Sequence, residues 1–180
     1  MNVFDEIQGI FHARGAVEYF GERVSMIDHA LQAAYFAQLA SAAPALIVGA
    51  LLHDIGHLID QVPSDIADWT EDAHHERLGS QWLAKRFRPE VSEPVRLHVA
   101  AKRYLLATNA GYLAQLSPAS VITLRLQGGP METREVAAFE TERFYRDAVR
   151  LRRWDDEGKV AGLRTPGLSD YQSLIERVIL

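Results

Sequence analysis

The segment that most constrains the fold is an apolar stretch that ends directly in two ionisable residues. Nearly every side chain over residues 42–52 is apolar, and His53 and Asp54 follow at once. A helix that is apolar on all sides is buried, and Pro44 suits the first turn, so we predict a buried helix over residues 44–58. A buried imidazole and carboxylate are costly unless they are paired or bind a metal ion. The core must therefore accommodate this pair.

The other apolar residues recur with the period of an α-helix. The clearest stripe consists of Met26, Ile27, Ala30, Leu31, Ala34 and Ala37. Further helices are predicted over residues 21–40, 74–87, 94–108, 118–126, 133–154 and 169–179, and the acidic stretch 60–72 predicts a loop. No alternating run of β-branched residues indicates a strand. We predict an all-α fold, a compact single-domain helical bundle of six or seven helices over residues 1–180.

Charge and composition exclude several classes of protein. Among the 180 residues, 24 are acidic and 19 are basic, a net charge of -5 that gives no electrostatic basis for binding nucleic acid or an anionic membrane. Because there is no cysteine, disulfides, zinc ribbons and thiolate clusters are excluded. The N-terminus does not resemble a signal peptide, and the longest apolar stretch is shorter than the ~20 residues that span a bilayer. We therefore expect a cytoplasmic protein.

Four of the predicted helices each contain at least one histidine. His29, His53, His75 and His98 lie on four different predicted helices, and Asp54 and Asp155 offer carboxylates. Imidazole and carboxylate together suit iron, zinc or manganese, and helical bundles build dinuclear sites from such inward side chains. His74 is an alternative to His75 as a ligand, whereas His12 lies outside every motif and is expected to be a surface or packing residue.

Five short motifs give these residues a recognisable order. They are YFGE (19–22), LLHDIGH (51–57), HVAAKRYL (98–105), QGGPM (127–131) and RRWDDEGK (152–159). With the histidines and aspartates between them, they resemble the HD-domain superfamily in its six-ligand, dinuclear form. In finer detail the chain is similar to the mixed-valent diiron oxygenases that cleave organophosphonates. The resemblance covers roughly residues 17–171.

The resemblance implies a role for each position. One iron would be held by His29, His53 and Asp155, the other by His75 and His98, and Asp54 would bridge them. Tyr19 would complete the shell of the second iron and withdraw when substrate arrives, and Glu22 would receive the substrate's ammonium group. The phosphonate would be bound by His57, Lys102, Ser120, Thr123, Gln127 and Arg152. Tyr19, Glu22, His57 and Lys102 would take part in catalysis.

The resemblance also implies a reaction. A Fe(II)/Fe(III) pair and dioxygen as co-substrate would cleave the C–P bond of a 1-hydroxy-2-aminoethylphosphonate, giving phosphate and glycine, or glycine betaine if the amine is trimethylated. The methylation state of the amine is left open, because Glu22 suits either cation. An aromatic cage of Trp69 and Trp82 would serve a quaternary amine, although tryptophans usually pack in a core. A separate 2-oxoglutarate-dependent hydroxylase would supply the hydroxylated substrate.

Two alternatives share part of the pattern. An HD-domain phosphohydrolase or phosphodiesterase would use His29, His53, Asp54 and Asp155 to activate water against a phosphate ester. The additional ligands His75 and His98, the pair Tyr19 and Glu22, and a histidine rather than lysine at position 57 favour the oxygenase. A non-catalytic regulatory HD module is disfavoured, because such a module need not retain intact ligands and basic residues.

Overall fold

A computed structural model describes residues 2–59 and 74–180, and within these ranges it is helical, with isolated β-bridges and no strand. The α-helices are α1 (Val3–Arg14), α2 (Met26–Leu39), α3 (Pro44–Leu52), α4 (Ile55–Ile59), α5 (His75–Ala84), α6 (Pro89–Thr108), α7 (Pro118–Leu126), α8 (Thr133–Glu140), α9 (Tyr145–Glu157) and α10 (Gln172–Arg177). Two short 3-10 helices, η2 (Tyr112–Gln115) and η3 (Leu168–Tyr171), complete the set. The prediction of an all-α fold is confirmed.

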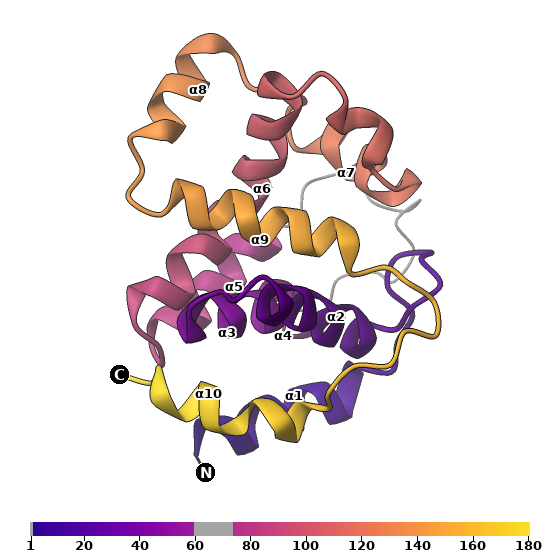
Figure 1. The fold of residues 1–180 in the computed structure, drawn as a ribbon, viewed down its shortest axis with the longest axis vertical. Helices are drawn as coiled ribbons and strands as arrows, with labels where there is room; N and C mark the ends of the chain where they lie inside the picture. The colour runs from indigo at the N-terminus through magenta and orange to yellow at the C-terminus, as the bar shows by residue number, and fades with distance from the viewer. Residues whose placement is uncertain (1, 60–73) are drawn as a thin grey trace.

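The helices are layered around α3, whose apolar side chains are buried as predicted. In Figure 1, α9 crosses the middle of the molecule, with α2, α3, α4 and α5 below and behind it. Helices α1 and α10 lie side by side at the end near both termini, and α6, α7 and α8 form the opposite end. One large apolar core contains side chains from helices α1 through α6 and from α9 and α10. A smaller core, around Leu97 and Phe139, joins α6 with α8 and α9.

Several helix boundaries differ from the sequence-based prediction. Helix α1 was not predicted, although Asn2 and Asp5 form a capping box at its start. The helix predicted from residue 21 begins only at Met26, because Phe20 and Gly21 have positive φ angles and Ser25 caps α2. The loop predicted over residues 60–72 and Trp69 of the proposed cage lie outside the described residues.

Other predicted helices are interrupted or extended. The helix predicted over residues 133–154 is two helices, α8 and α9, because Thr141 ends α8, its hydroxyl donating to the carbonyl of Ala138 at 2.7 Å. The helix predicted over 44–58 is likewise divided into α3 and α4 at His53 and Asp54. Helix α6 begins at Pro89 rather than Pro94, which is accommodated inside it.

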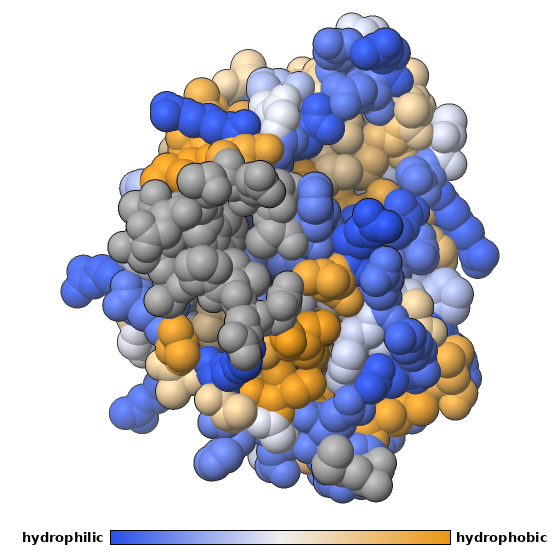
Figure 2. Space-filling view, turned by 180° about the vertical axis from the view of Figure 1, so that it is seen from behind, coloured by the Kyte–Doolittle hydropathy of each residue, from blue (hydrophilic) through white to orange (hydrophobic). Residues whose placement is uncertain are grey.

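The outer surface mixes polar and apolar residues. Figure 2 shows strongly polar side chains scattered over the face opposite to that of Figure 1, with apolar residues in small patches between them. In the part of the chain that the structure describes, no helix has the length and apolar character needed to cross a membrane.

Helices α4 and α5 approach so closely that a side chain does not fit between them. A Cβ atom added to Gly56 would lie 2.0 Å from the carbonyl oxygen of His75. Because His75 is the first residue of α5, this contact also sets where its imidazole lies.

We expect Gly56→Ala to lower the free energy of unfolding by about 3 kcal/mol, since overpacking against backbone forces helices apart. Gly9→Ala is the matched control: Gly9 lies exposed in α1 with no atom within 4 Å of the added Cβ, and the change should stabilise by about 0.5–1 kcal/mol. Urea denaturation measures both. Equal unfolding midpoints for the two variants would contradict the close approach.

Candidate dinuclear metal centre

Six potential metal ligands meet at the centre of the molecule from five elements. His29 lies on α2, His53 and Asp54 at the junction of α3 and α4, His75 at the start of α5, His98 within α6, and Asp155 near the end of α9. All six are buried, with exposures of 6% or less. The structure therefore brings together all the residues predicted as ligands, and His74 lies exposed outside the cluster.

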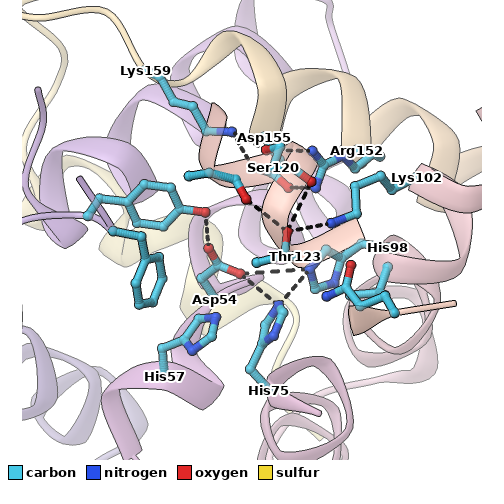
Figure 3. Close-up of a pocket in the computed structure, with 15 residues that line it drawn as sticks. Asp54, His57, His75, His98, Lys102, Ser120, Thr123, Arg152, Asp155 and Lys159 are labelled. Atoms are coloured by element: carbon cyan, nitrogen blue, oxygen red, sulfur yellow. Dashed lines mark hydrogen bonds and ion pairs between the residues drawn. The ribbon is translucent and has the colours of Figure 1, made fainter. Parts of the chain in front are cut away.

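Asp54 stands between two pairs of imidazoles. Its Oδ2 lies 3.6 Å from Nε2 of His29 and 3.3 Å from Nε2 of His53. Its Oδ1 lies 3.3 Å from Nε2 of His75 and 3.7 Å from Nε2 of His98. One oxygen of a single carboxylate thus faces each pair (Figure 3 shows the pair with His75 and His98). Asp155 completes the first group, with Oδ1 3.5 Å from Nε2 of His29.

Three of the imidazoles are oriented by the backbone. Their Nδ1 atoms lie at hydrogen-bond distance from carbonyl oxygens: His29 from Gly158 at 2.8 Å, His53 from Ala50 at 2.8 Å, and His98 from Val95 at 2.7 Å. With Nδ1 directed to a carbonyl, Nε2 is the ring atom that faces the other side chains of the cluster and, once deprotonated, can bind a metal ion. A Cβ at position 158 would lie 3.2 Å from Nδ1 of His29, so only glycine allows this approach without crowding the ring.

The residues fit two metal ions. The Nε2 atoms are 3.1 Å apart within each pair, His29 with His53 and His75 with His98. Nitrogen atoms at this distance can share one proton, and the same spacing matches two ligands that lie about 2.1 Å from one ion and therefore about 3.0 Å apart. Oδ1 of Asp155 is buried without a hydrogen-bond partner, as expected for an oxygen reserved for a cation. Two groups of three ligands sharing Asp54 therefore suit a dinuclear centre.

Both carboxylates of the centre are ionised. Burial alone would raise the pKa of Asp54, but the neighbouring imidazoles, His53 first, hold it well below its usual value. Arg152 and Lys159 outweigh burial in the same way at Asp155 and lower its pKa. The carboxylates are therefore already in the form that binds metal.

Tyr19 closes one side of the centre. Its hydroxyl donates to Oδ2 of Asp54 at 2.7 Å, and its ring stacks on that of His29 at 3.9 Å. Tyr19 thus lies on the side of Asp54 that faces His29 and His53, whereas the resemblance implied a place beside His75 and His98. A tyrosine that holds a ligand by one hydrogen bond can leave without breaking the helical frame, because it lies in the turn before α2.

A cavity beside the centre is lined by basic and hydroxyl side chains. Lys102, one turn beyond His98 on α6, donates to Oγ1 of Thr123 at 2.9 Å. Ser120 and Thr123 lie one turn apart on α7 and face the same cavity, as Figure 3 shows. Gln127 and His57 also line it, and the ring of His57 stacks on His75 at 3.9 Å. Basic groups facing hydroxyls beside a metal centre can bind a tetrahedral anion.

The guanidinium of Arg152 contacts mainly Asp155, a proposed metal ligand, and the residues around it. Nη1 donates to Oδ2 of Asp155 at 2.6 Å, and Nη2 is paired with Oδ1 of Asp156. Nε donates to the hydroxyl of Tyr112 at 3.1 Å, and Tyr112 in turn donates to Asp156. Sequence reasoning missed Tyr112 and Asp156, because nothing in the chain indicates that η2 packs against α9.

Two further residues near the centre are Lys159 and Glu22. Lys159 was noted only as part of a motif, yet it lines the cavity beside Ser120. Its spacing of four residues from Asp155 was the signal that could have identified it. Glu22 is not among the residues lining the cavity; it lies in the same turn as Tyr19, and its Oε1 is buried without a hydrogen-bond partner.

Lys102 makes anion binding depend on pH. Burial, followed by repulsion from Arg152, lowers the pKa of Lys102 to about 7. As the pH rises through 7 the ammonium is lost, so the affinity for a sulfonate, which stays ionised throughout, should fall by up to about tenfold per pH unit between pH 7 and 9. Calorimetric titration with methanesulfonate measures this. Lys102→Arg should flatten the profile because arginine stays protonated, and an equally steep profile in that variant would contradict the assignment.

Comparison with known proteins agrees with this geometry. Residues 26–139 match the HD domain, a range that contains every proposed ligand except Asp155. The chain is 42% identical over 178 residues to the [1-hydroxy-2-(trimethylamino)ethyl]phosphonate dioxygenase (glycine-betaine-forming) of Leisingera caerulea, covering 99% of this chain and 91% of that protein. It is 46% identical over 159 residues to the hydroxymethylphosphonate dioxygenase of Gimesia maris, covering 88% and 79%. The chain therefore belongs to the HD-domain family, among its oxygen-dependent, phosphonate-cleaving enzymes.

Proposed function

We propose that the protein is a diiron oxygenase that cleaves the C–P bond of a 1-hydroxyphosphonate. In the proposed reaction the carbinol carbon loses its hydrogen and its bond to phosphorus and becomes a carboxylate. Phosphorus leaves as inorganic phosphate, one proton is released, and both atoms of dioxygen are incorporated. An aminated substrate would give glycine and a trimethylated one glycine betaine.

The observation that carries the proposal is the single carboxylate of Asp54 between two imidazole pairs, beside a cavity with Lys102 and Arg152. His29, His53, Asp54 and Asp155 would hold one iron, and His75, His98 and Asp54 the other. Nitrogen and carboxylate donors without thiolate suit iron, and iron suits the oxygen dependence of both relatives. When bound, the iron pair supplies dioxygen binding and one-electron exchange, which side chains cannot.

The residues of the cavity would orient the substrate. Lys102, Ser120, Thr123 and Gln127 would bind the phosphonate oxygens, with His57 and one remaining N–H of Arg152 closing the site. This binding would direct the hydroxyl-bearing carbon toward the centre and exclude water from it. Tyr19 would exchange its hydrogen bond to Asp54 for a position away from the entering substrate.

The experiment measures oxygen consumption and phosphate release by iron-loaded, partly oxidised enzyme. Hydroxymethylphosphonate, 2-amino-1-hydroxyethylphosphonate and its N-trimethyl form are compared. The proposal expects one phosphate for each dioxygen consumed. Phosphate release that continues without oxygen would favour the phosphohydrolase instead. Because the substrates already carry a hydroxyl, we also propose that a separate 2-oxoglutarate-dependent hydroxylase supplies them.

Glu22 distinguishes between the substrates. A carboxylate oxygen buried without a partner is costly, and an ammonium group would satisfy it. We expect Glu22→Gln to lower kcat/KM about tenfold or more for the amine-bearing phosphonates and less than twofold for hydroxymethylphosphonate. Steady-state kinetics with the three substrates measure this. Equal losses with all three would show that Glu22 does not recognise the amine.

A further inference from the structure

Lys159 enters the cavity from the segment that follows α9. It comes directly after Gly158, the residue that caps the C-terminus of α9. Its side chain is only 9% exposed. The Nζ atom donates to Oγ of Ser120 at 3.2 Å and lies 3.6 Å from Oδ1 of Asp155 (Figure 3). The ammonium group of Lys159 thus lines the cavity.

The backbone on both sides of Lys159 is fixed by buried polar groups of α2. The carbonyl of Gly158 accepts from Nδ1 of His29 at 2.8 Å. The amide of Gln32, only 1% exposed, accepts from the N–H of Val160 and donates to its carbonyl, both at 2.9 Å. Both Gln32 and His29 lie on α2, so one helix carries a proposed metal ligand and also binds the segment that contains Lys159. This double amide contact pairs both backbone polar groups of Val160 and so fixes the position of the loop there.

The two lysines reach the same face of α7 from different elements. Lys102 of α6 contacts Thr123, and Lys159 contacts Ser120, one turn earlier. In Figure 3 the two ammonium groups lie on different sides of these hydroxyls. Each lysine has N–H donors beyond those that these contacts use, because an ammonium group has three.

Arg152, in contrast, has few donors left. Its contacts with Asp155, Asp156, Tyr112 and Ser120 engage four of its five N–H groups. A guanidinium so engaged holds Asp155 in place for a metal ion and has little capacity for a substrate. Lys159 lies at ion-pair distance from Oδ1 of Asp155, but its hydrogen bond goes to Ser120, so further N–H donors of its ammonium group can bind an anion.

We propose that Lys159 is a substrate-binding residue, and that Lys159 and Lys102 together bind the phosphonate oxygens while Arg152 positions Asp155. Gln32 is then a positioning residue that acts through the backbone of Val160. The inference deepens the proposed function, on which its phosphonate substrate rests. It assigns to Lys159 a contact that the family motifs gave to Arg152.

The test is anaerobic calorimetric titration of the metal-loaded, full-length enzyme with methylphosphonate and with inorganic phosphate. Lys159→Gln should weaken both affinities about 10–100-fold, since it removes a charge-assisted hydrogen bond in a buried site. Lys159→Arg should recover part of this loss. Gln32→Leu, which keeps Lys159 but frees its backbone, should weaken binding about threefold to tenfold. Arg153→Gln, the same change of charge at an exposed position of α9, should have little effect.

Three results would overturn the inference. One is wild-type anion affinity in Lys159→Gln. Another is an equal loss in Arg153→Gln, which would indicate a general effect of charge. The third is loss of bound metal in Lys159→Gln, measured by elemental analysis, which would mean that Lys159 acts through Asp155. Binding is measured without oxygen, so an enzyme that binds these anions but does not consume oxygen would overturn the proposed function and leave this inference standing.

Discussion

Replacing Asp54 by asparagine is expected to lower turnover at least about a thousandfold and to reduce bound metal from two ions to one or none. The variant keeps the shape of the side chain, but an amide offers one oxygen where the carboxylate offers two. Its NH₂ group cannot bind a cation and would face one of the two imidazole pairs, whose Nε2 atoms lie 3.3–3.7 Å from the present Oδ1 or 3.3–3.6 Å from Oδ2. A thousandfold loss corresponds to about 4 kcal/mol of transition-state stabilisation.

Metal analysis together with phosphate release measures both effects. Asp147→Asn is the control, because it removes the same charge from a residue that does not line the cavity. Asp147 lies on α9 in a half-exposed ion pair with Arg150. The activity and metal content of this variant should match those of the unchanged protein. An Asp54→Asn enzyme that retains two ions would show that Asp54 does not bridge them.

Removing the metal is expected to lower the melting temperature by about 8–16 °C. The centre buries four imidazoles and two carboxylates, and a cation that these side chains bind only in the folded chain stabilises the fold. An ion present at about 1,000 times its dissociation constant adds about 4 kcal/mol, and for a chain of this size each kcal/mol moves the melting temperature by about 2–4 °C.

Differential scanning calorimetry of the protein before and after chelation measures the shift. Adding Fe(II) back should restore the original melting temperature. In Asp54→Asn the shift should shrink, since fewer ions are bound. A melting temperature that does not depend on the chelator would indicate that the six side chains form a hydrogen-bonded core rather than a metal centre.

Four of the six proposed ligands could be predicted from local sequence pattern, whereas the choice of His75 over His74 and the role of Asp155 came from the resemblance to the HD-domain family. His53 and Asp54 end an apolar helix, and His29 and His98 interrupt apolar helical faces. A charged or polar residue where the local pattern demands an apolar one is visible without any tertiary information. The all-α fold follows from the same periodicity.

Helix ends were predicted less well, because caps and turns depend on one or two side chains. The start of α2 is set by Ser25 and by the positive φ angles of Phe20 and Gly21. The break between α8 and α9 is set by Thr141. In each case the apolar pattern continues through the boundary, so periodicity alone extends the helix too far.

The chain by itself determined which residues could hold metal, since their chemical type and burial follow from local pattern. Only the tertiary structure decided which groups each basic residue contacts. Whether Arg152 faces a substrate or Asp155, and whether Lys159 reaches the cavity, depends on Tyr112, Asp156 and Gln32, which come from η2, α9 and α2. Hydrogen bonds between side chains distant in sequence leave no periodic trace, because each needs only one polar atom in the right place.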